Sequence, residues 1–230
     1  MGFFAESLGT GLGLIVALDA DLRRIVATSL FTSLSAVGLA SMIAVPAGVL
    51  TALADFRGKA LLKHGLNALM AVPTVVVGLV LYGLLSRRGV FGDYGLLFTP
   101  FAMIIGQTVL VAPLIWNLVL TAVEARDPRL AFTCRALGAN RRQQALIVIH
   151  EARHALVAAT ILGFGRAIGE VGVAMMLGGN IEHHTRTMTT AIALETSKGA
   201  FALALALGIV LVVIALAVNL ALSLLQGVRR

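Results

Sequence analysis

Long apolar stretches alternate with shorter polar ones along this chain. Four of them carry no charged residue, and a fifth carries only Arg166 and Glu170; they cover residues 25–54, 65–86, 94–123, 199–227 and, for the fifth, 155–179. Each is longer than the roughly 20 residues with which a helix crosses about 30 Å of hydrocarbon. The stretches lack the two-residue alternation of a membrane barrel. We therefore predict an all-α polytopic membrane protein with five transmembrane helices.

Composition supports one membrane domain over residues 1–230. Hydrophobic residues make up 59% of the chain and the mean hydropathy is +0.96, whereas soluble domains hold roughly 45–50% apolar residues. Residues 1–24 lack the basic leader of a signal peptide, and we predict an N-terminal interfacial segment there. The single cysteine, Cys134, excludes an intrachain disulfide.

Three prolines stand within predicted spans, at Pro46, Pro73 and Pro113. Proline in a membrane helix kinks or unwinds it where neighbouring protein or water satisfies the freed backbone. Ordinary helix packing is one interpretation of each proline. All three together favour a protein that moves or lines a path.

A polar segment, residues 124–154, separates the third and fourth predicted spans. It holds six arginines and three acidic residues in a chain that otherwise carries little charge. This segment and the C-terminus lie on the side with more Lys and Arg, which makes that side cytoplasmic and places the N-terminus outside. The net charge of +7 is explained by this bias and by attraction to anionic membrane lipid, so it indicates no nucleic-acid partner.

The polar segment carries the signals of two short helices around a turn. Asp127-Pro128 is a typical helix start, and Gly138 is suited to a left-handed C-terminal position. Asn140 with Gln143 three residues later predicts a capping box for a second helix that continues into the fourth span. A solvated loop is the alternative.

A helix, a glycine and a second helix between two predicted spans form a pattern that resembles the "EAA" loop of ABC importer permeases. That loop docks as a coupling helix on a separate ATPase subunit. Gly138 and Ala139 match the pattern, whereas Phe132, Thr133 and Cys134 replace its Glu-Ala-Ala and His150-Glu151 replace its Leu-Pro. The resemblance implies an ATPase-coupling site formed by Asp127, Pro128, Leu130, Phe132, Thr133, Cys134, Leu137, Gly138, Ala139, Asn140 and Arg141.

Residues 163–195, GFGRAIGEVGVAMMLGGNIEHHTRTMTTAIALE, resemble oxyanion importer permeases more specifically. Their Arg-Ala-x-Gly-Glu-x-Gly core is shared with molybdate and sulfate permeases, and the fuller string is most similar to the tungstate branch. The resemblance implies a permease that works by alternating access in the prokaryotic cell (inner) membrane. It also implies a second copy of the chain, two cytoplasmic ABC ATPase subunits that bind ATP and Mg, and an extracytoplasmic oxyanion-binding protein. This chain itself is expected to bind no cofactor.

Arg166 and Glu170 are the two charges within the fifth stretch. Ionised side chains there cost at least about 2.5–3.5 kcal/mol each on insertion scales, and their i,i+4 spacing places them on one helix face. One interpretation is an ion pair that fixes packing. The other is that Arg166 adds positive potential to an anion route, partly neutralised by Glu170.

The loop after this span, residues 178–195, is predicted to lie outside. Its hydroxyl and cationic groups suit a tetrahedral oxyanion, so we predict a pathway mouth at Asn180, Thr185, Arg186 and Thr189. A plain connecting loop is the alternative. The adjacent His183 and His184 have no matching ligand set, and we predict no metal site.

Two other classes of protein remain as alternatives. His150-Glu151-Ala152-Arg153-His154 fits the short His-Glu-x-x-His pattern of zinc proteases, although no further ligand is obvious. A secondary transporter is disfavoured because no inverted repeat is visible. The sequence has no phosphate-binding loop, so uphill transport requires ATP hydrolysis on another subunit, and the chain is predicted not to be an enzyme.

Overall fold

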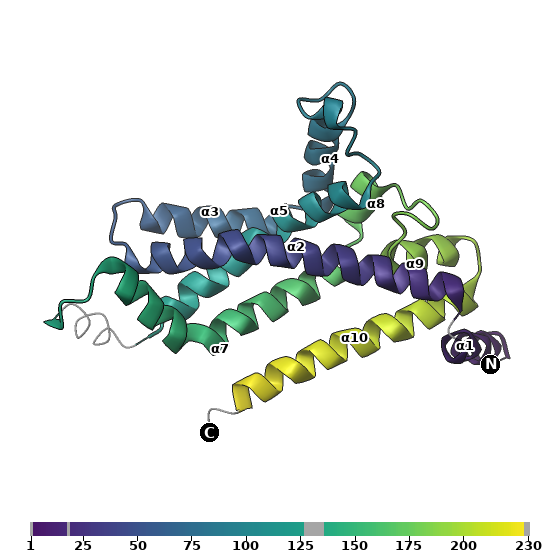
Figure 1. Ribbon diagram of the computed structural model, residues 1–230. Coiled ribbons are helices and arrows are strands. Elements are labelled where there is room, and N and C mark those ends of the chain that lie inside the picture. The colour runs from purple at the N-terminus through teal and green to yellow at the C-terminus, as the bar shows by residue number, and fades with distance from the viewer. Residues whose placement is uncertain (1, 18, 127–135, 228–230) are drawn as a thin grey trace.

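The computed structural model describes residues 2–17, 19–126 and 136–227, and within these ranges all regular structure is helical. Figure 1 shows long helices packed side by side, with short helices at one end and on one flank. The elements are α1 (Gly2–Val16), α2 (Ala20–Leu53), α3 (Lys59–Ala71), α4 (Thr74–Leu85), η1 (Gly92–Tyr94), α5 (Pro100–Glu124), α7 (Arg141–Ile168), α8 (Gly172–Gly178), α9 (Met188–Ser197) and α10 (Phe201–Gly227). The all-α prediction is confirmed.

Four helices, α2, α5, α7 and α10, are each long and apolar enough to cross a membrane. The second predicted span, residues 65–86, is not a straight helix, which corrects our expectation. It belongs to α3 and α4, which meet at a bend of 93°, so α4 projects from the body in Figure 1. Val72 is extended and Pro73 precedes α4. Proline lacks an N–H and disfavours a helical residue before it, so the helix ends there.

The other two prolines do not interrupt their helices. α2 continues through Pro46 and α5 continues through Pro113. These two helices pack closely, because a methyl group on Gly48 would lie only 2.7 Å from Val119 Cγ1. Small residues permit such backbone approach in membranes. Of the three prolines, only Pro73 stands at a helix break.

The fifth apolar stretch is also broken. We expected one span over residues 155–179, but α7 begins earlier, at Arg141, and ends at Ile168. A short break follows, and α8 then covers Gly172–Gly178. Arg166 therefore lies in the last turn of α7 and Glu170 lies in the break, rather than both being within one continuous helix.

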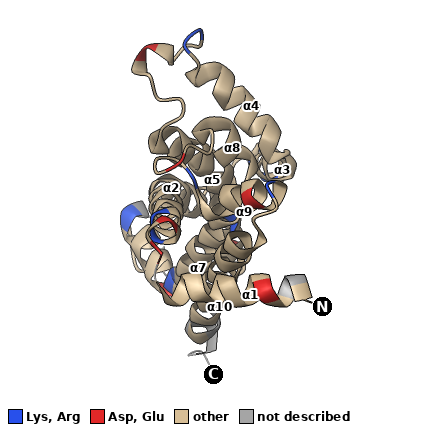
Figure 2. Cartoon of the chain, turned by 90° about the vertical axis from the view of Figure 1, so that its right-hand side faces the viewer, with Lys and Arg blue, Asp and Glu red and all other residues tan. Residues whose placement is uncertain are grey.

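The N-terminal helix α1 crosses the end of the bundle instead of following its axis (Figures 1 and 2). It packs on α10, where a methyl group on Gly11 would lie 2.8 Å from the main-chain oxygen of Ala202. Its position suits the interfacial segment that we predicted. That segment is shorter than residues 1–24, because α2 already begins at Ala20.

The main core lies between α2, α5, α7, α9 and α10. A smaller cluster joins α4, α5 and α8 through Leu85, Ala102, Val173 and Leu177. Charged residues gather at loops and helix ends, and the bodies of the helices are largely uncharged (Figure 2). This separation is what a lipid-embedded bundle requires.

Candidate functional site

The two helix breaks meet inside the protein. Gly172 begins α8 and Thr74 begins α4. A methyl group on Gly172 would lie 2.7 Å from Thr74 Oγ1 and 3.1 Å from Val75 Cγ2. The bend at Pro73 and the break after Ile168 are therefore in direct contact, although about a hundred residues separate them in the sequence.

Small residues allow α8 to pack into this junction. Gly106 of α5 faces Val173 and Leu177, with no room for a Cβ atom. Gly78 of α4 faces Met176, whose Cβ would lie 3.1 Å from an added methyl group. Because such close approach tolerates little added volume, α8 is held between α4 and α5.

Arg166 and Glu170 form an ion pair across the break. Arg166 Nη1 lies 2.7 Å from Glu170 Oε2. Glu170 Oε1 accepts a hydrogen bond of 3.2 Å from the backbone N–H of Val173, so the same carboxylate caps the start of α8. The side chain of Glu170 is 3% exposed, whereas that of Arg166 is 44% exposed on the single chain. The carboxylate is thus fixed inside the fold, and the guanidinium faces outward.

Gln107 is a residue of this junction that sequence reasoning missed. It lies in the middle of α5, is buried, and donates from Nε2 to the main-chain oxygen of Ala167 at 3.4 Å. The same oxygen accepts the backbone N–H of Glu170 at 3.1 Å. Gln107 therefore adds a side-chain hydrogen bond to a carbonyl group in the last turn of α7, where the regular helical pattern ends. An amide side chain in the middle of an apolar stretch was the signal that the sequence offered.

The predicted pathway-mouth residues are mostly built into the fold. Thr185 is fully buried, accepts the N–H of Ile181 at 3.0 Å and donates to the oxygen of Gly178. Thr189 is buried and donates to the main-chain oxygen of Glu170 at 2.8 Å. Asn180 Nδ2 donates to the oxygen of Thr190 at 3.4 Å. In the single chain Thr189 therefore binds the break itself, whereas Thr185 and Asn180 hold the loop that follows α8.

The helix α9 is fastened to α2 at its start. Thr187 and Thr190 form a capping box, and the N–H of Met188 donates to Ser29 Oγ at 2.7 Å. All four side chains are buried. This arrangement holds the loop of residues 178–195 against α2, and it follows from hydroxyl groups that satisfy helix-end N–H groups.

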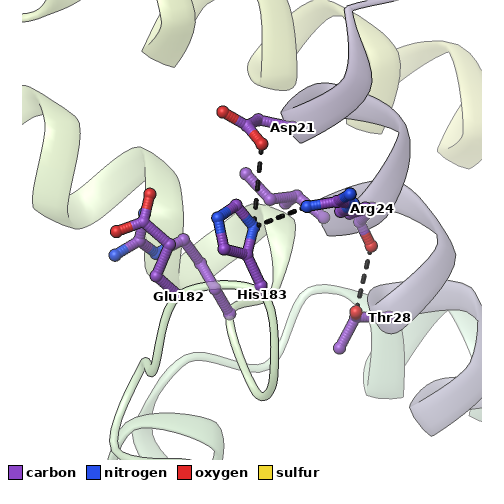
Figure 3. Close-up of a pocket in the computed structure, with 7 residues that line it drawn as sticks. Asp21, Arg24, Thr28, Glu182 and His183 are labelled. Carbon is purple, nitrogen blue, oxygen red and sulfur yellow. Dashed lines mark hydrogen bonds and ion pairs between the residues drawn. The ribbon is translucent and has the colours of Figure 1, made fainter.

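A charged cluster closes the same end of the molecule (Figure 3). His183 Nδ1 lies 3.2 Å from Arg24 Nη1 and 3.6 Å from Asp21 Oδ1. Arg186, the fourth predicted mouth residue, lines the same small pocket and pairs with Glu182 at 3.5 Å. Acidic and basic side chains are both present here, so the cluster joins the loop of residues 178–195 to α2 without a large excess of either charge.

The described part of the polar segment, residues 124–154, has the predicted turn and cap. Gly138 has φ +75°, in the left-handed region. Asn140 Oδ1 accepts the N–H of Gln143 at 2.9 Å, and Gln143 Oε1 accepts the N–H of Asn140 at 2.8 Å. Leu137 is 81% exposed and Ala139 is half-buried. The remaining predicted coupling residues lie outside the described residues, namely Asp127, Pro128, Leu130, Phe132, Thr133 and Cys134, and of Arg141 only the backbone is described.

Ion pairs that the sequence did not reveal flank this segment. Lys59 Nζ lies 3.1 Å from Glu124 Oε1, and Lys63 binds the other oxygen of the same carboxylate. Arg126 Nη1 lies 3.1 Å from Glu151 Oε1. These contacts join the start of α3 and the first half of α7 to the end of α5. The polar segment is therefore connected by ion pairs to α3, α5 and α7.

The residues of the His-Glu-x-x-His pattern are used differently. Glu151 pairs with Arg126, and His150 Nε2 lies 3.1 Å from Arg153 Nη1. Within the described ranges, no group of three His, Cys, Asp or Glu side chains is placed to hold a metal ion. The geometry of the described residues thus gives the metalloprotease alternative no support.

Comparison with known proteins shows which family and which relatives this chain is similar to. Residues 44–228 match the family model "Binding-protein-dependent transport system inner membrane component". The chain is 39% identical to the tungstate uptake system permease protein TupB of Peptoclostridium acidaminophilum, over 87% of this chain and 88% of the relative. It is 40% identical to a probable anion ABC transporter permease protein of Haloferax volcanii, over 77% and 79%. It is 42% identical to TupB of Campylobacter jejuni, over 64% and 62%.

The family match covers most of the chain, and its description as an inner membrane component agrees with the four helices that are long and apolar enough to cross a membrane. It favours the transporter over the metalloprotease. The chain belongs to the family of binding-protein-dependent transport system inner membrane components, and it is a multi-pass permease subunit of an ABC importer, not an enzyme.

Proposed function

We propose that this permease carries tungstate into the cell. The observation that carries the proposal is the similarity to tungstate permeases, which extends over 87% of the chain in one relative and includes the junction at Arg166 and Glu170. Molybdate and sulfate are also tetrahedral dianions, so they are the alternative substrates. The choice between anions of such similar shape is expected to lie in the binding protein.

The complete transporter contains two copies of this chain. The projecting helix α4 supports this proposal, because its free faces are apolar: Val75, Val76, Leu79 and Val80 are 46–59% exposed. An apolar cavity of about 300 Å³ lies in the angle of the bend, between α2, α3, α4 and α5. A second copy would cover such surfaces and enclose a pathway between the two chains, as closed two-fold assembly allows.

Two ATPase subunits would dock at the cytoplasmic segment, and they would bind the ATP and Mg that drive transport. The exposed Leu137 and the left-handed Gly138 support this placement. The ion pairs of Glu124 and Glu151 would pass movement of the docked subunit to α3, α5 and α7. Alternating access then follows from rigid-body motion of these helices.

The opposite end would receive an extracytoplasmic binding protein, with the N-terminus outside and the C-terminus in the cytoplasm. α1, the outer loop and the charged cluster around His183 lie together at that end (Figure 1). Asn180, Thr185, Arg186 and Thr189 would stabilise the pathway mouth from within. Their buried hydroxyl and amide groups would hold the loop in shape instead of binding the anion directly.

Reconstitution tests the proposal. The permease, its ATPase and its binding protein are placed in liposomes that contain ATP and Mg, and uptake of tungstate is measured with and without competing molybdate or sulfate. We expect ATP-dependent tungstate uptake that requires all three proteins. Uptake of molybdate or sulfate in preference to tungstate would transfer the assignment to that anion, and ATP-independent uptake would contradict the ABC mechanism.

A further inference from the structure

Arg166 has hydrogen-bonding capacity that the fold does not use. Its Nη1 atom donates to Glu170, and the structure gives its side chain no other partner within the described ranges. A guanidinium carries five N–H donors in a planar fork that matches tetrahedral and planar oxyanions. Most of this fork is therefore free, and 44% of the side chain is exposed on the single chain.

The depth of Arg166 along α7 restricts what its exposed side can face. At 1.5 Å per residue, it lies about 17 Å along α7 from Ala155, where the apolar stretch begins, which is roughly half the hydrocarbon thickness. A charged group at that depth avoids lipid and faces protein, water or a ligand. Among the described residues no second acidic side chain is paired with it, so its outward side is available to an anion.

Glu170 cannot follow the guanidinium if it turns away. The carboxylate is held by the N–H of Val173, and its main-chain oxygen is held by Thr189. Its backbone N–H is bonded to Ala167. Arg166 has rotatable side-chain bonds and, among the described residues, a single hydrogen-bonding partner, so the pair is built from a fixed acceptor and a movable donor.

From this asymmetry we propose that Arg166 is a transient binding site for a tetrahedral dianionic oxyanion inside the pathway. The anion replaces the Glu170 carboxylate as partner of the guanidinium, and it leaves when the carboxylate takes the guanidinium back. Glu170 therefore sets how weakly the anion is held. A two-copy transporter contains two such arginines. This inference rests on the proposed function and adds a binding residue to it.

Direct binding provides the first test. Permease–ATPase complex is purified without binding protein, and retained tungsten is measured after equilibrium dialysis against sodium tungstate. Glu170→Gln keeps an oxygen for the Val173 N–H but removes the competing charge, so we expect at least about tenfold tighter binding than in wild type. The double variant Arg166→Gln/Glu170→Gln should lose this gain. Perrhenate, a tetrahedral monoanion, should bind the Glu170→Gln complex more weakly than tungstate. Equal binding by wild type, single and double variants would overturn the inference.

Transport provides the second test, and it separates the inference from the proposed function. In the complete reconstituted system, anions transported per ATP hydrolysed should fall at least about tenfold in Arg166→Gln and less in Arg166→Lys, which keeps the charge. The matched control is Arg23→Gln, an exposed arginine in the first turn of α2, which should keep the wild-type ratio. A purely structural Arg166 would lower uptake, ATP hydrolysis and thermal stability together, with an unchanged ratio of anions transported to ATP hydrolysed.

If Arg166→Gln cannot be purified, Glu170→Gln and Arg166→Lys decide the question. Absence of tungstate uptake by wild type would overturn the proposed function, whereas normal coupling in Arg166→Gln would overturn only this inference.

Discussion

Gly172 lies against Thr74, so that a methyl group on the glycine would come within 2.7 Å of the threonine hydroxyl. This contact joins the start of α8 to the start of α4. Two helices that are each interrupted within an apolar stretch are thereby interrupted at the same place in space. Broken helices in membrane proteins are tolerated where the loosened backbone is enclosed by protein or lines a cavity, and this junction meets that condition.

Gly172→Ala should destabilise the protein by about 1–3 kcal/mol, because the added methyl group forces α8 away from α4. Thr74→Ala in the same chain should recover part of this loss, since it removes the closest atom but leaves Val75 Cγ2 at 3.1 Å. Unfolding in detergent measures both effects. The matched control is Gly208→Ala in α10, where nothing lies within 4 Å; a similar loss in the control would contradict the explanation.

Arg166→Ala and Glu170→Ala should each destabilise the protein, and their effects should not add. Removal of the arginine leaves a buried carboxylate without its cation, and removal of the glutamate also removes the cap on Val173. The double alanine variant should recover about 1–3 kcal/mol of the summed loss, the usual range for residues in contact. Thermal unfolding of all four proteins in one detergent measures this coupling, and additive losses would argue against the pair.

Gly138→Val should weaken association with the ATPase while leaving the isolated permease folded. Its φ of +75° is unfavourable for a β-branched residue. Among the described residues, no atom beyond its chain neighbours lies within 4 Å of the position of its Cβ, so we expect the strain to stay local. Gly138→Asn is the matched control, because asparagine tolerates the left-handed region. Co-purification with the ATPase should fall for valine and persist for asparagine. Loss of the permease fold in the valine variant would contradict a local effect.

Labelling of introduced cysteines tests the orientation. In a Cys134→Ser background, Glu182→Cys and His184→Cys should react with an impermeant thiol reagent added outside, because both positions are exposed. Thr185→Cys and Thr189→Cys should react slowly, because their side chains are buried. Leu137→Cys, also exposed, should react only after the membrane is opened. Reaction of Leu137→Cys from outside would reverse the topology.

The helix signals in the polar segment, residues 124–154, could be recognised from the sequence because they depend on local chemistry. The capping box of Asn140 and Gln143 depends on side chains three residues apart, and the left-handed Gly138 depends on the absence of a Cβ atom. Neither requires a distant partner. The apolar stretches could also be recognised from the sequence, because lipid imposes a minimum length on a spanning helix.

Hydropathy measures how many residues are apolar, and it does not give the direction of the chain. For that reason the 93° bend at Pro73 and the break after Ile168 were not predicted. Proline alone did not decide the outcome, since α2 and α5 pass through Pro46 and Pro113 without a break.

The roles of single polar residues were decided by distant neighbours. Gln107 acquires its function from the end of α7, and Thr189 acquires its function from Glu170. The sequence by itself determined the membrane class, the number of apolar stretches and the i,i+4 spacing of Arg166 and Glu170. Only the tertiary structure decided that Glu170 is buried and Arg166 exposed, because burial depends on which helices pack around a residue and not on its spacing along the chain.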